Sequence, residues 1–304
     1  MRNIRSQTRR DRLLYDEFCL QVSLFLFGTV HHSIMIDEKY VTDFGATPTM
    51  MVTVWKLLVH EGLPTTSLPL HLLWWLYLVR NYPTKQVKER MFKVCGTTYH
   101  KHLEPLQICI IKIQRHVIKY KNRFKNSVGR SIHLTWDGTD FRCNNRPNAK
   151  LVRKAKWKNL PFDPRYWSHK FNGAGLRYGI AICIQSGEIV GAHGPKPAGH
   201  WPDIKIFKKY ALPILLPGEM VEADRGLRHP RCRNPEDYLS NSELAAKKKA
   251  VSRHEVVNGR LKNWRSLYHK FRHDHHEHKY FFFTAAVVDN LMYRKYGAVF
   301  DVDH

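Results

Sequence analysis

The stretch Leu176–His193, LRYGIAICIQSGEIVGAH, decides the fold class of this chain. From Leu176 to Ile184 every second residue is apolar, which is the period of a β-strand. Ser186-Gly187 is a two-residue turn, and Glu188–His193 is predicted to pair back as the second strand of a hairpin. The residues on either side supply the rest of a sheet.

Two further strands flank this hairpin in the sequence. Residues 131–137 alternate in the same way, and Asp137-Gly138 is predicted to end that strand as a turn. Met220–Ala223 predicts a strand that delivers Asp224 at its end. Between them, Asp203 is expected to cap a short helix.

Helices complete the second half of the chain. The patterns predict a loop over residues 227–242, a helix over 243–264 and a last helix over 284–296, which Gly297 stops. The order strand, hairpin, helix, strand, helix is typical of an α/β domain in which helices cover a mixed sheet. We assign residues 126–304 to this domain.

The first 125 residues have helical patterns. We predict one helix over 68–81 and a second over 84–92 with Thr84 as its N-cap. A third helix should start at Thr97, and Pro105 should kink or restart it. Residues 84–104 therefore have the outline of a DNA-binding helix-turn-helix, although a three-helix bundle without DNA contact has the same outline.

Composition points to a polyanionic partner. The chain has 304 residues, and 50 lysines and arginines against 26 acids give a formal net charge of +24. Such an excess on a chain with 43% hydrophobic residues favours nucleic acid over a small neutral substrate. The longest apolar run near the start, Phe18–Val30, is shorter than a membrane span, so we expect a buried helix there and no membrane. The six cysteines form no C-x-x-C pair and are expected to be free thiols.

Three carboxylates form the candidate catalytic and metal site. Asp137 and Asp224 are expected at strand ends, and Glu255 lies on the shoulder of the apolar stripe of the helix that follows them. The stripe comprises Ala250, Val257, Leu261 and Trp264, with His254 in register. The shoulder also carries Lys248, Val251, Asn258 and Lys262. Taken singly, each has a structural explanation: turn chemistry, an Asp224-Arg225 ion pair, or ion pairs along the helix. Together they match the oxygen ligands of a two-metal site for phosphoryl transfer, which predicts two Mg²⁺ or two Mn²⁺ ions as cofactors.

Five segments carry a family resemblance. They are Trp136–Asp140, Trp167–Tyr178, Gly199–Asp203, Glu222–Gly226 and Arg253–Lys262. In this order, behind a helical leader, they resemble the DDE-superfamily endonucleases of Harbinger-type transposases. The resemblance runs from about residue 74 to the C-terminus.

The resemblance implies a ribonuclease-H-like fold and a DNA transposase activity. The family's acids fall on Asp137, Asp224 and Glu255, its additional aspartate on Asp203, and its arginine on Arg253. It implies metal-dependent cleavage at transposon ends, strand transfer, a homo-oligomer when active, a nuclear location and a possible Myb-like DNA-binding partner. The phosphate contacts expected are Lys170, Arg253 and Lys262. The alternatives are a domesticated protein that binds DNA or acts as a scaffold without cleaving it, and an RNA-directed nuclease of the same fold.

Four other features have more than one interpretation. Lys150–Lys158 could be a nuclear-localisation signal, a phosphate track or a solvated loop, and Lys247–Lys249 has the same ambiguity. His269–His278 holds five histidines, for which extra charge against DNA is favoured over zinc. Glu222 could be an extra metal ligand or a supporting acid.

Overall fold

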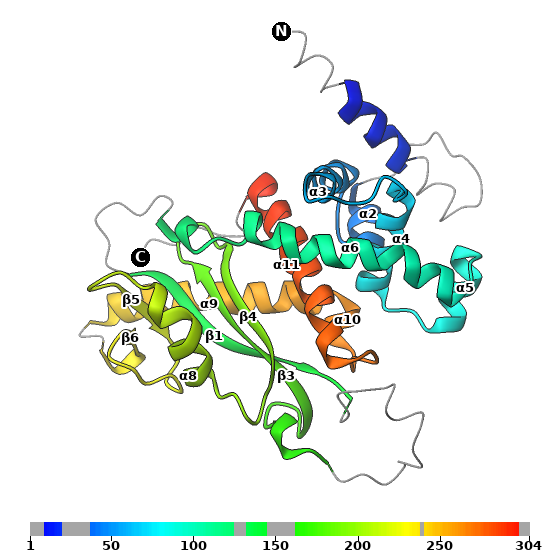
Figure 1. Ribbon diagram of the computed structural model, residues 1–304. Helices are drawn as coiled ribbons and strands as arrows, with labels where there is room; N and C mark the ends of the chain where they lie inside the picture. The colour runs from blue at the N-terminus through cyan, green and yellow to red at the C-terminus, as the bar shows by residue number, and fades with distance from the viewer. Residues whose placement is uncertain (1–8, 20–36, 125–131, 145–161, 238–239, 298–304) are drawn as a thin grey trace. The chain divides into compact units, whose positions relative to one another are not determined.

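A computed structural model describes residues 9–19, 37–124, 132–144, 162–237 and 240–297 (Figure 1). They belong to two compact units. Unit 1 comprises Met1–His116, Trp264–Ser266 and Phe283–Met292. Unit 2 comprises Val117–Asn263, Leu267–Phe282 and Tyr293–His304. The chain therefore enters unit 2 at Val117, whereas the sequence places the domain boundary near residue 125.

Between residues 9 and 117, all regular secondary structure in the described residues is helical. The helices are residues 9–19, α2 (Asp37–Phe44), α3 (Pro48–His60), α4 (Pro69–Asn81), α5 (Lys85–Phe92) and α6 (Gly96–Val117). The predicted helices at 68–81 and 84–92 are confirmed, and the Thr84 side chain accepts a hydrogen bond from the Val87 amide as an N-cap should.

Helix α6 is continuous through Pro105, so the predicted restart at this residue is wrong. The helix also begins at Gly96, which removes Thr97 from the cap position. Proline costs the helix one backbone donor, but Leu103, Leu106 and the following apolar positions of the stripe are buried. Burial of this face outweighs the lost hydrogen bond.

The segment predicted as a helix-turn-helix contributes to the core of unit 1. Lys93, in the left-handed conformation, ends α5 just before α6 begins. The Tyr99 ring stacks on Trp74 and Phe92, with centroids 5.9 and 5.2 Å apart, and its hydroxyl donates to the Trp74 carbonyl. Tyr99 is therefore a packing residue, and DNA contact by residues 84–104 stays a prediction.

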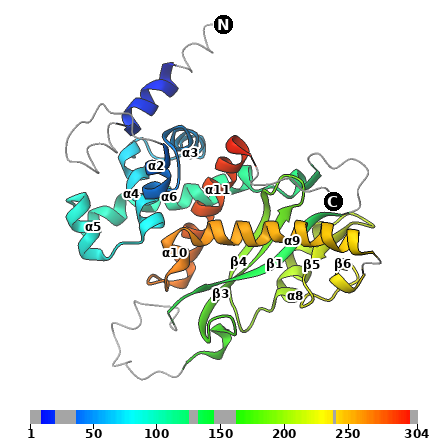
Figure 2. The same cartoon turned by 180° about the vertical axis from the view of Figure 1, so that it is seen from behind.

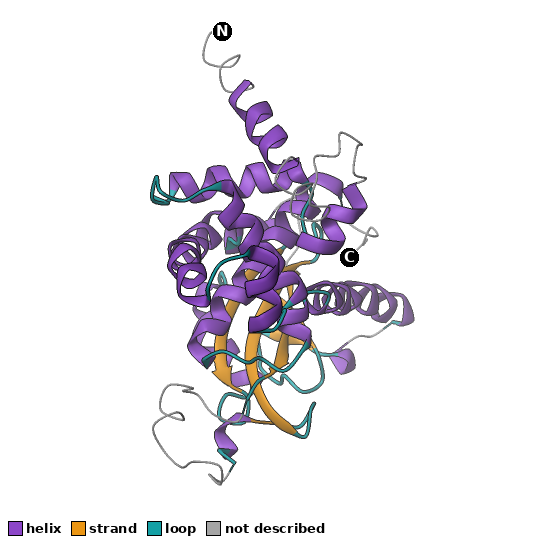
Figure 3. Ribbon diagram, turned by 90° about the vertical axis from the view of Figure 1, so that its right-hand side faces the viewer, coloured by secondary structure: helices purple, strands orange, loops and turns teal. Residues whose placement is uncertain are grey.

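Unit 2 contains a mixed sheet of six strands, coloured orange in Figure 3. The strands are β1 (Ile132–Arg142), β2 (Trp167–Ser168), β3 (Gly173–Cys183), β4 (Ile189–Pro197), β5 (Met220–Ala223) and β6 (Cys232–Arg233). Strand β3 runs antiparallel to β1, β2 and β4, whereas β5 is parallel to both β1 and β6. The hairpin around Ser186-Gly187 and the mixed α/β architecture are thus confirmed.

Strand β1 continues five residues beyond Asp137, so the predicted turn at Asp137-Gly138 is wrong. Pairing with β3 extends to Arg142, and this long-range ladder overrides the local turn preference. Gly138 is buried in the strand, where a side chain would collide with Asp203: an added Cβ would lie 1.7 Å from its Oδ1. The glycine is required for this close approach.

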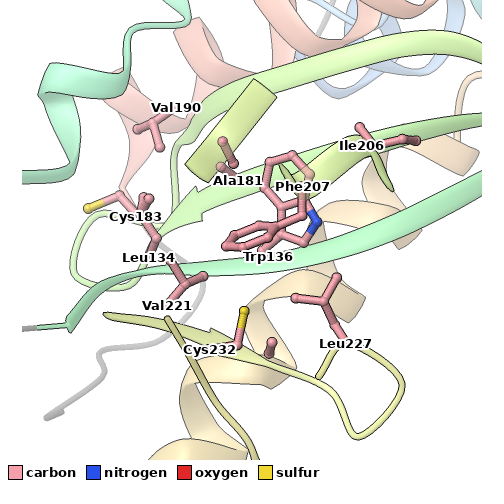
Figure 4. Close-up of a cluster of buried hydrophobic side chains, with 12 residues drawn as sticks. Leu134, Trp136, Ala181, Cys183, Val190, Ile206, Phe207, Val221, Leu227 and Cys232 are labelled. Atoms are coloured by element: carbon pink, nitrogen blue, oxygen red, sulfur yellow. The ribbon is translucent and has the colours of Figure 1, made fainter. Parts of the chain in front are cut away.

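Helices cover both faces of the sheet. Helix α8 (Asp203–Ile206), the π-helical turn η3 (Phe207–Ala211) and their neighbours pack on one face, and α9 (Asn241–Lys262) crosses the other (Figures 1 and 2). On the α8 face, Trp136 meets Phe207 edge-on at 5.7 Å between centroids, within a cluster of buried apolar side chains (Figure 4). This cluster fixes β1 and β5 relative to each other.

In the C-terminal part, several helices begin at residues other than those predicted. Helix α9 begins after the Ser240 cap, α10 spans Arg265–Tyr268, and α11 spans His278–Tyr296, six residues longer at its start than predicted. Gly297 ends α11 with φ 85° as expected. Strand β6 and one short helix interrupt the predicted 227–242 loop. The short helices are η1 (Tyr120–Phe124), η2 (Pro164–Tyr166), η4 (Leu212–Ile214), η5 (Pro235–Asp237) and η6 (His275–Glu277).

Two expectations from composition can be compared with the structure. All six cysteines are free thiols, as predicted. Among the described residues, no helix combines the length and the apolar character that crossing a membrane requires.

Candidate functional site

Asp137 lies on β1, and Asp224 directly follows the neighbouring parallel strand β5. The register of β1 and β5 pairs Thr135 with Glu222, and the two aspartates stand two residues further along their chains. Neighbouring strands are about 4.8 Å apart, and residues two apart share a face of the sheet. Both acids therefore continue the face that carries Thr135 and Glu222, although Asp137 is inside its strand and not at its end.

Helix α9 covers this face through side-chain hydrogen bonds on both sides of Asp137. The Thr135 hydroxyl lies 2.6 Å from His254 Nδ1, and the Thr139 hydroxyl donates to Asn258 Oδ1 at 2.6 Å. Because both pairs advance by four residues, α9 runs in the same direction as β1. The two contacts hold the helix in register beside the first aspartate.

His254 is a neutral positioning residue beside the candidate glutamate. Its Nε2 lies 3.1 Å from the Ile180 carbonyl, which can only accept, so Nε2 carries the proton and Nδ1 accepts from Thr135. Burial lowers the pKa of His254, and the negative charge of Asp137 opposes that shift. The sequence placed His254 on the buried stripe of the helix, and its burial confirms this.

Asp224 and Glu255 line one pocket of about 320 Å³ at the end of β5. Lys248 and Val251 line the same pocket, as predicted from their positions on the shoulder of α9. Both carboxylates are exposed on its wall. Asp137 is not among the described residues that line this pocket. It is placed near the pocket by the pairing of its strand, β1, with β5.

None of the three carboxylates forms an ion pair within 4.0 Å with a described residue. Arg225 pairs with Glu236 and not with Asp224, and neither Lys248 nor Lys262 pairs with Glu255. Other acids of the sheet and its surroundings do have cationic partners within 2.7 Å. These pairs are Asp140–Arg177, Glu188–Arg294, Glu219–Arg123 and Glu222–Lys247.

Glu222 is committed to a buried ion pair. The side chains of Glu222 and Lys247 are 0% and 3% exposed, and Lys247 Nζ lies 2.7 Å from the carboxylate. The ammonium also donates to the Ala223 and Arg233 carbonyls, at 3.0 and 2.5 Å. The interpretation of Glu222 as an extra metal ligand therefore gives way to a structural one, and Lys247 is not a surface cation.

Asp203 has a role that the sequence did not predict. The N-cap of α8 is Pro202, so Asp203 is not a cap, and its carboxylate instead points at Gly138. Arg177 Nε lies 3.3 Å from Asp203 Oδ1. Burial raises the pKa of Asp203, Arg177 opposes the rise, and the charge of Asp137 adds to it. The sequence feature that could have indicated this contact is Gly138, the small residue beside Asp137.

The three residues expected to contact phosphates lie in different environments. Lys170 is exposed, and its ammonium donates to the Gly138 carbonyl at 2.8 Å, beside the first acid. Lys262 is exposed at the end of α9. Arg253 is 1% exposed and donates to the Gln185 carbonyl at 3.0 Å, so its guanidinium faces the protein interior and not a bound phosphate.

The three candidate acids do not converge on a single ion site. Asp137, Asp224 and Glu255 do not bring three ligand atoms within 4.8 Å, whereas His60–Glu61–His116 and Asp274–His276–Glu277 do so among the described residues. Mg²⁺ sits about 2.1 Å from its ligands, and paired ions are about 4 Å apart. Oxygens that bind different ions can thus be roughly 8 Å apart.

Comparison with known proteins adds no assignment. No protein-family model, curated protein or solved structure matches this chain. The site is therefore interpreted from its own geometry.

Two of the five histidines in His269–His278 are buried, and two other candidate segments lie largely outside the described residues. His278 is fully buried against the Tyr178 hydroxyl at 2.9 Å, and burial lowers its pKa to about 3. His275 Nε2 lies 2.8 Å from the Asn144 carbonyl, so these two histidines add no charge for DNA. Lys150–Lys158 and most of Phe18–Val30 lie outside the described residues.

Proposed function

We propose that this chain is a metal-dependent DNA endonuclease of the DDE type with a ribonuclease-H-like catalytic domain. One observation carries the proposal: Asp224 and Glu255 line the same pocket, Asp137 lies on the strand that pairs with β5, and none of the three forms an ion pair within 4.0 Å with a described residue. Carboxylates that pair with no described cation are available to bind divalent cations from solution. The mixed sheet with α9 across its acidic face supports the fold assignment.

Each acid has a distinct place in the proposed site. Asp224 and Glu255 offer hard oxygen donors in the pocket, and Asp137 offers another from the adjacent strand. Two Mg²⁺ or Mn²⁺ ions bound there would lower the pKa of the attacking water and neutralise charge on the leaving 3′ oxygen. His254 and Asn258 hold α9 so that Glu255 keeps its position. Lys170 is the cation best placed to contact a phosphate near Asp137.

The basic surface supplies the affinity for DNA. Each phosphate neutralised by lysine or arginine releases counterions, so binding should weaken with a slope of about −0.9 per contact in log K against log salt. Hydrolysis at transposon ends and transfer of the freed 3′ hydroxyl to target DNA are the activities that the family resemblance adds to this proposal.

The test is nicking of a supercoiled plasmid in Mg²⁺ or Mn²⁺, with EDTA as the metal-free control. Wild-type protein should nick, and Glu255→Gln and Asp224→Asn should bind DNA equally well without nicking. Glu104→Gln is the matched control, because Glu104 is an exposed acid on α6 and is not among the residues that line the pocket.

Three outcomes would contradict the proposal. Tight, salt-sensitive binding without any nicking by wild type would favour a domesticated DNA-binding protein. Equal nicking by wild type and Glu255→Gln would remove the glutamate from the site. Equal cleavage of RNA and DNA duplexes would favour the RNA-directed nuclease.

A further inference from the structure

A second hollow surface lies at the far end of β1, in unit 2. Two adjoining hollows of about 310 and 280 Å³ share Arg142, Phe171 and Lys270. Lys262 and Tyr268 line the first of them as well. We call these five residues the β1-end surface.

The β1-end surface combines cations with accessible aromatic rings. Arg142, Lys262 and Lys270 are all exposed, and Tyr268 is 62% exposed. The Arg142 guanidinium lies 5.0 Å from the centre of the Phe171 ring. Cations next to exposed π-faces bind single-stranded nucleic acid, because the cations contact the phosphates and bases stack on the rings.

The nearby acid does not cancel this positive charge. Asp140 lines the first hollow, but its carboxylate is buried and accepts from Arg177 at 2.6 and 2.9 Å. The Ser168 hydroxyl donates to the same carboxylate at 2.6 Å. With Asp140 neutralised internally, the charge presented to a ligand is that of Arg142, Lys262 and Lys270.

Two elements lead from the candidate catalytic acids to the β1-end surface. Asp137 and Arg142 are five residues apart on β1, which is roughly 17 Å at 3.3 Å per residue. Glu255 and Lys262 are seven residues apart on α9, about 10 Å along the helix. Strand and helix run in the same direction and stay in contact between these points. A stacked DNA strand advances about 3.4 Å per nucleotide, so the distance along β1 corresponds to roughly five nucleotides.

We propose that the β1-end surface binds unpaired nucleotides of the DNA strand next to the bond that is cut. The position of the bound strand relative to the acids rests on the proposed nuclease function, whereas the binding itself does not. The phosphates lie against Arg142, Lys262 and Lys270, and an unpaired base stacks on Tyr268.

The experiment measures binding of the full chain to a fluorescent ten-nucleotide oligothymidylate in EDTA, by anisotropy. An abasic oligonucleotide of the same length is the second probe. Tyr268→Ala should weaken binding of the oligothymidylate about tenfold, because the stacking of one base contributes on this scale. The same variant should change the affinity for the abasic oligonucleotide less than about twofold. Tyr296→Ala is the matched control, because Tyr296 is also an exposed tyrosine, 53% accessible, outside the two hollows.

A second variant tests the cationic half of the surface. Lys270→Ala should weaken both oligonucleotides equally and reduce the salt slope by about one contact. Equal affinity of wild type for the two oligonucleotides would overturn the proposal, and so would an unchanged affinity of Tyr268→Ala. Since the assay contains no metal and no cleavage, a failed nuclease assay and a failed nucleotide-binding assay remain distinguishable.

Discussion

The buried pair of Glu222 and Lys247 underlies the proposed site, and its removal gives a quantitative prediction. Removing one partner of a buried ion pair leaves the other charge buried and unpaired, which costs about 3–5 kcal/mol of stability. Glu222→Leu should therefore destabilise the protein by about 3–5 kcal/mol, because the buried Lys247 ammonium would lose its carboxylate and be left with neutral acceptors such as the carbonyls of Ala223 and Arg233. Combining it with Lys247→Met removes both charges and should recover most of that loss.

Urea unfolding followed by circular dichroism measures both variants. The control is Glu236→Gln, which breaks the exposed Arg225–Glu236 pair (72% and 51% exposed) and should cost at most about 1 kcal/mol. A loss below about 1 kcal/mol for Glu222→Leu would refute the reasoning, as would a double variant no more stable than the single one. Metal-dependent nicking should fall with Glu222→Leu, because Asp224 follows directly on the strand that this pair holds.

Three further changes test other parts of unit 2. Glu255→Gln should abolish nicking yet shift the free energy of unfolding by no more than about 0.5 kcal/mol, since the side chain is exposed and forms no ion pair with a described residue. A larger loss would assign Glu255 a structural role. Gly138→Ala should lower the stability of the protein by about 1–3 kcal/mol, because the added methyl group would displace Asp203. Gly259→Ala is the control and should not destabilise the protein, because Gly259 has open space around it. Equal losses of stability would contradict the packing argument. Burial lowers the pKa of His193 to about 4, so below about pH 6.5 the unfolded chain binds more protons and stability falls as the pH drops towards 4. His193→Asn should flatten this slope in urea titrations at pH 7, 6 and 5, and an unchanged slope would exclude His193 as its source.

Periodic burial made part of the fold predictable. The hairpin at Ser186-Gly187 follows from strict alternation, and the stripe of α9 follows from helical spacing. Ala250, Val257 and Leu261 of that stripe are buried as predicted. Such patterns are local consequences of having one face towards a core, so a single sequence contains them.

Long-range pairing was not predictable from local patterns. Asp137-Gly138 has turn chemistry, but β3 pairs alongside and carries β1 through it to Arg142. The glycine is needed because Asp203, 65 residues later, occupies the space beside it. A local reading assigns such a glycine to a turn, because the residue that excludes a side chain is distant in the sequence.

Charge counting also could not show which cations face solvent. Lys247 and Arg253 look like surface cations on α9, yet both are buried and bonded to other parts of unit 2. The internal cations compensate the acids that the fold buries. The proposed site rests on the distinction between Glu222, which Lys247 neutralises, and Asp224 and Glu255, which form no ion pair with a described residue although Lys248 lines their pocket.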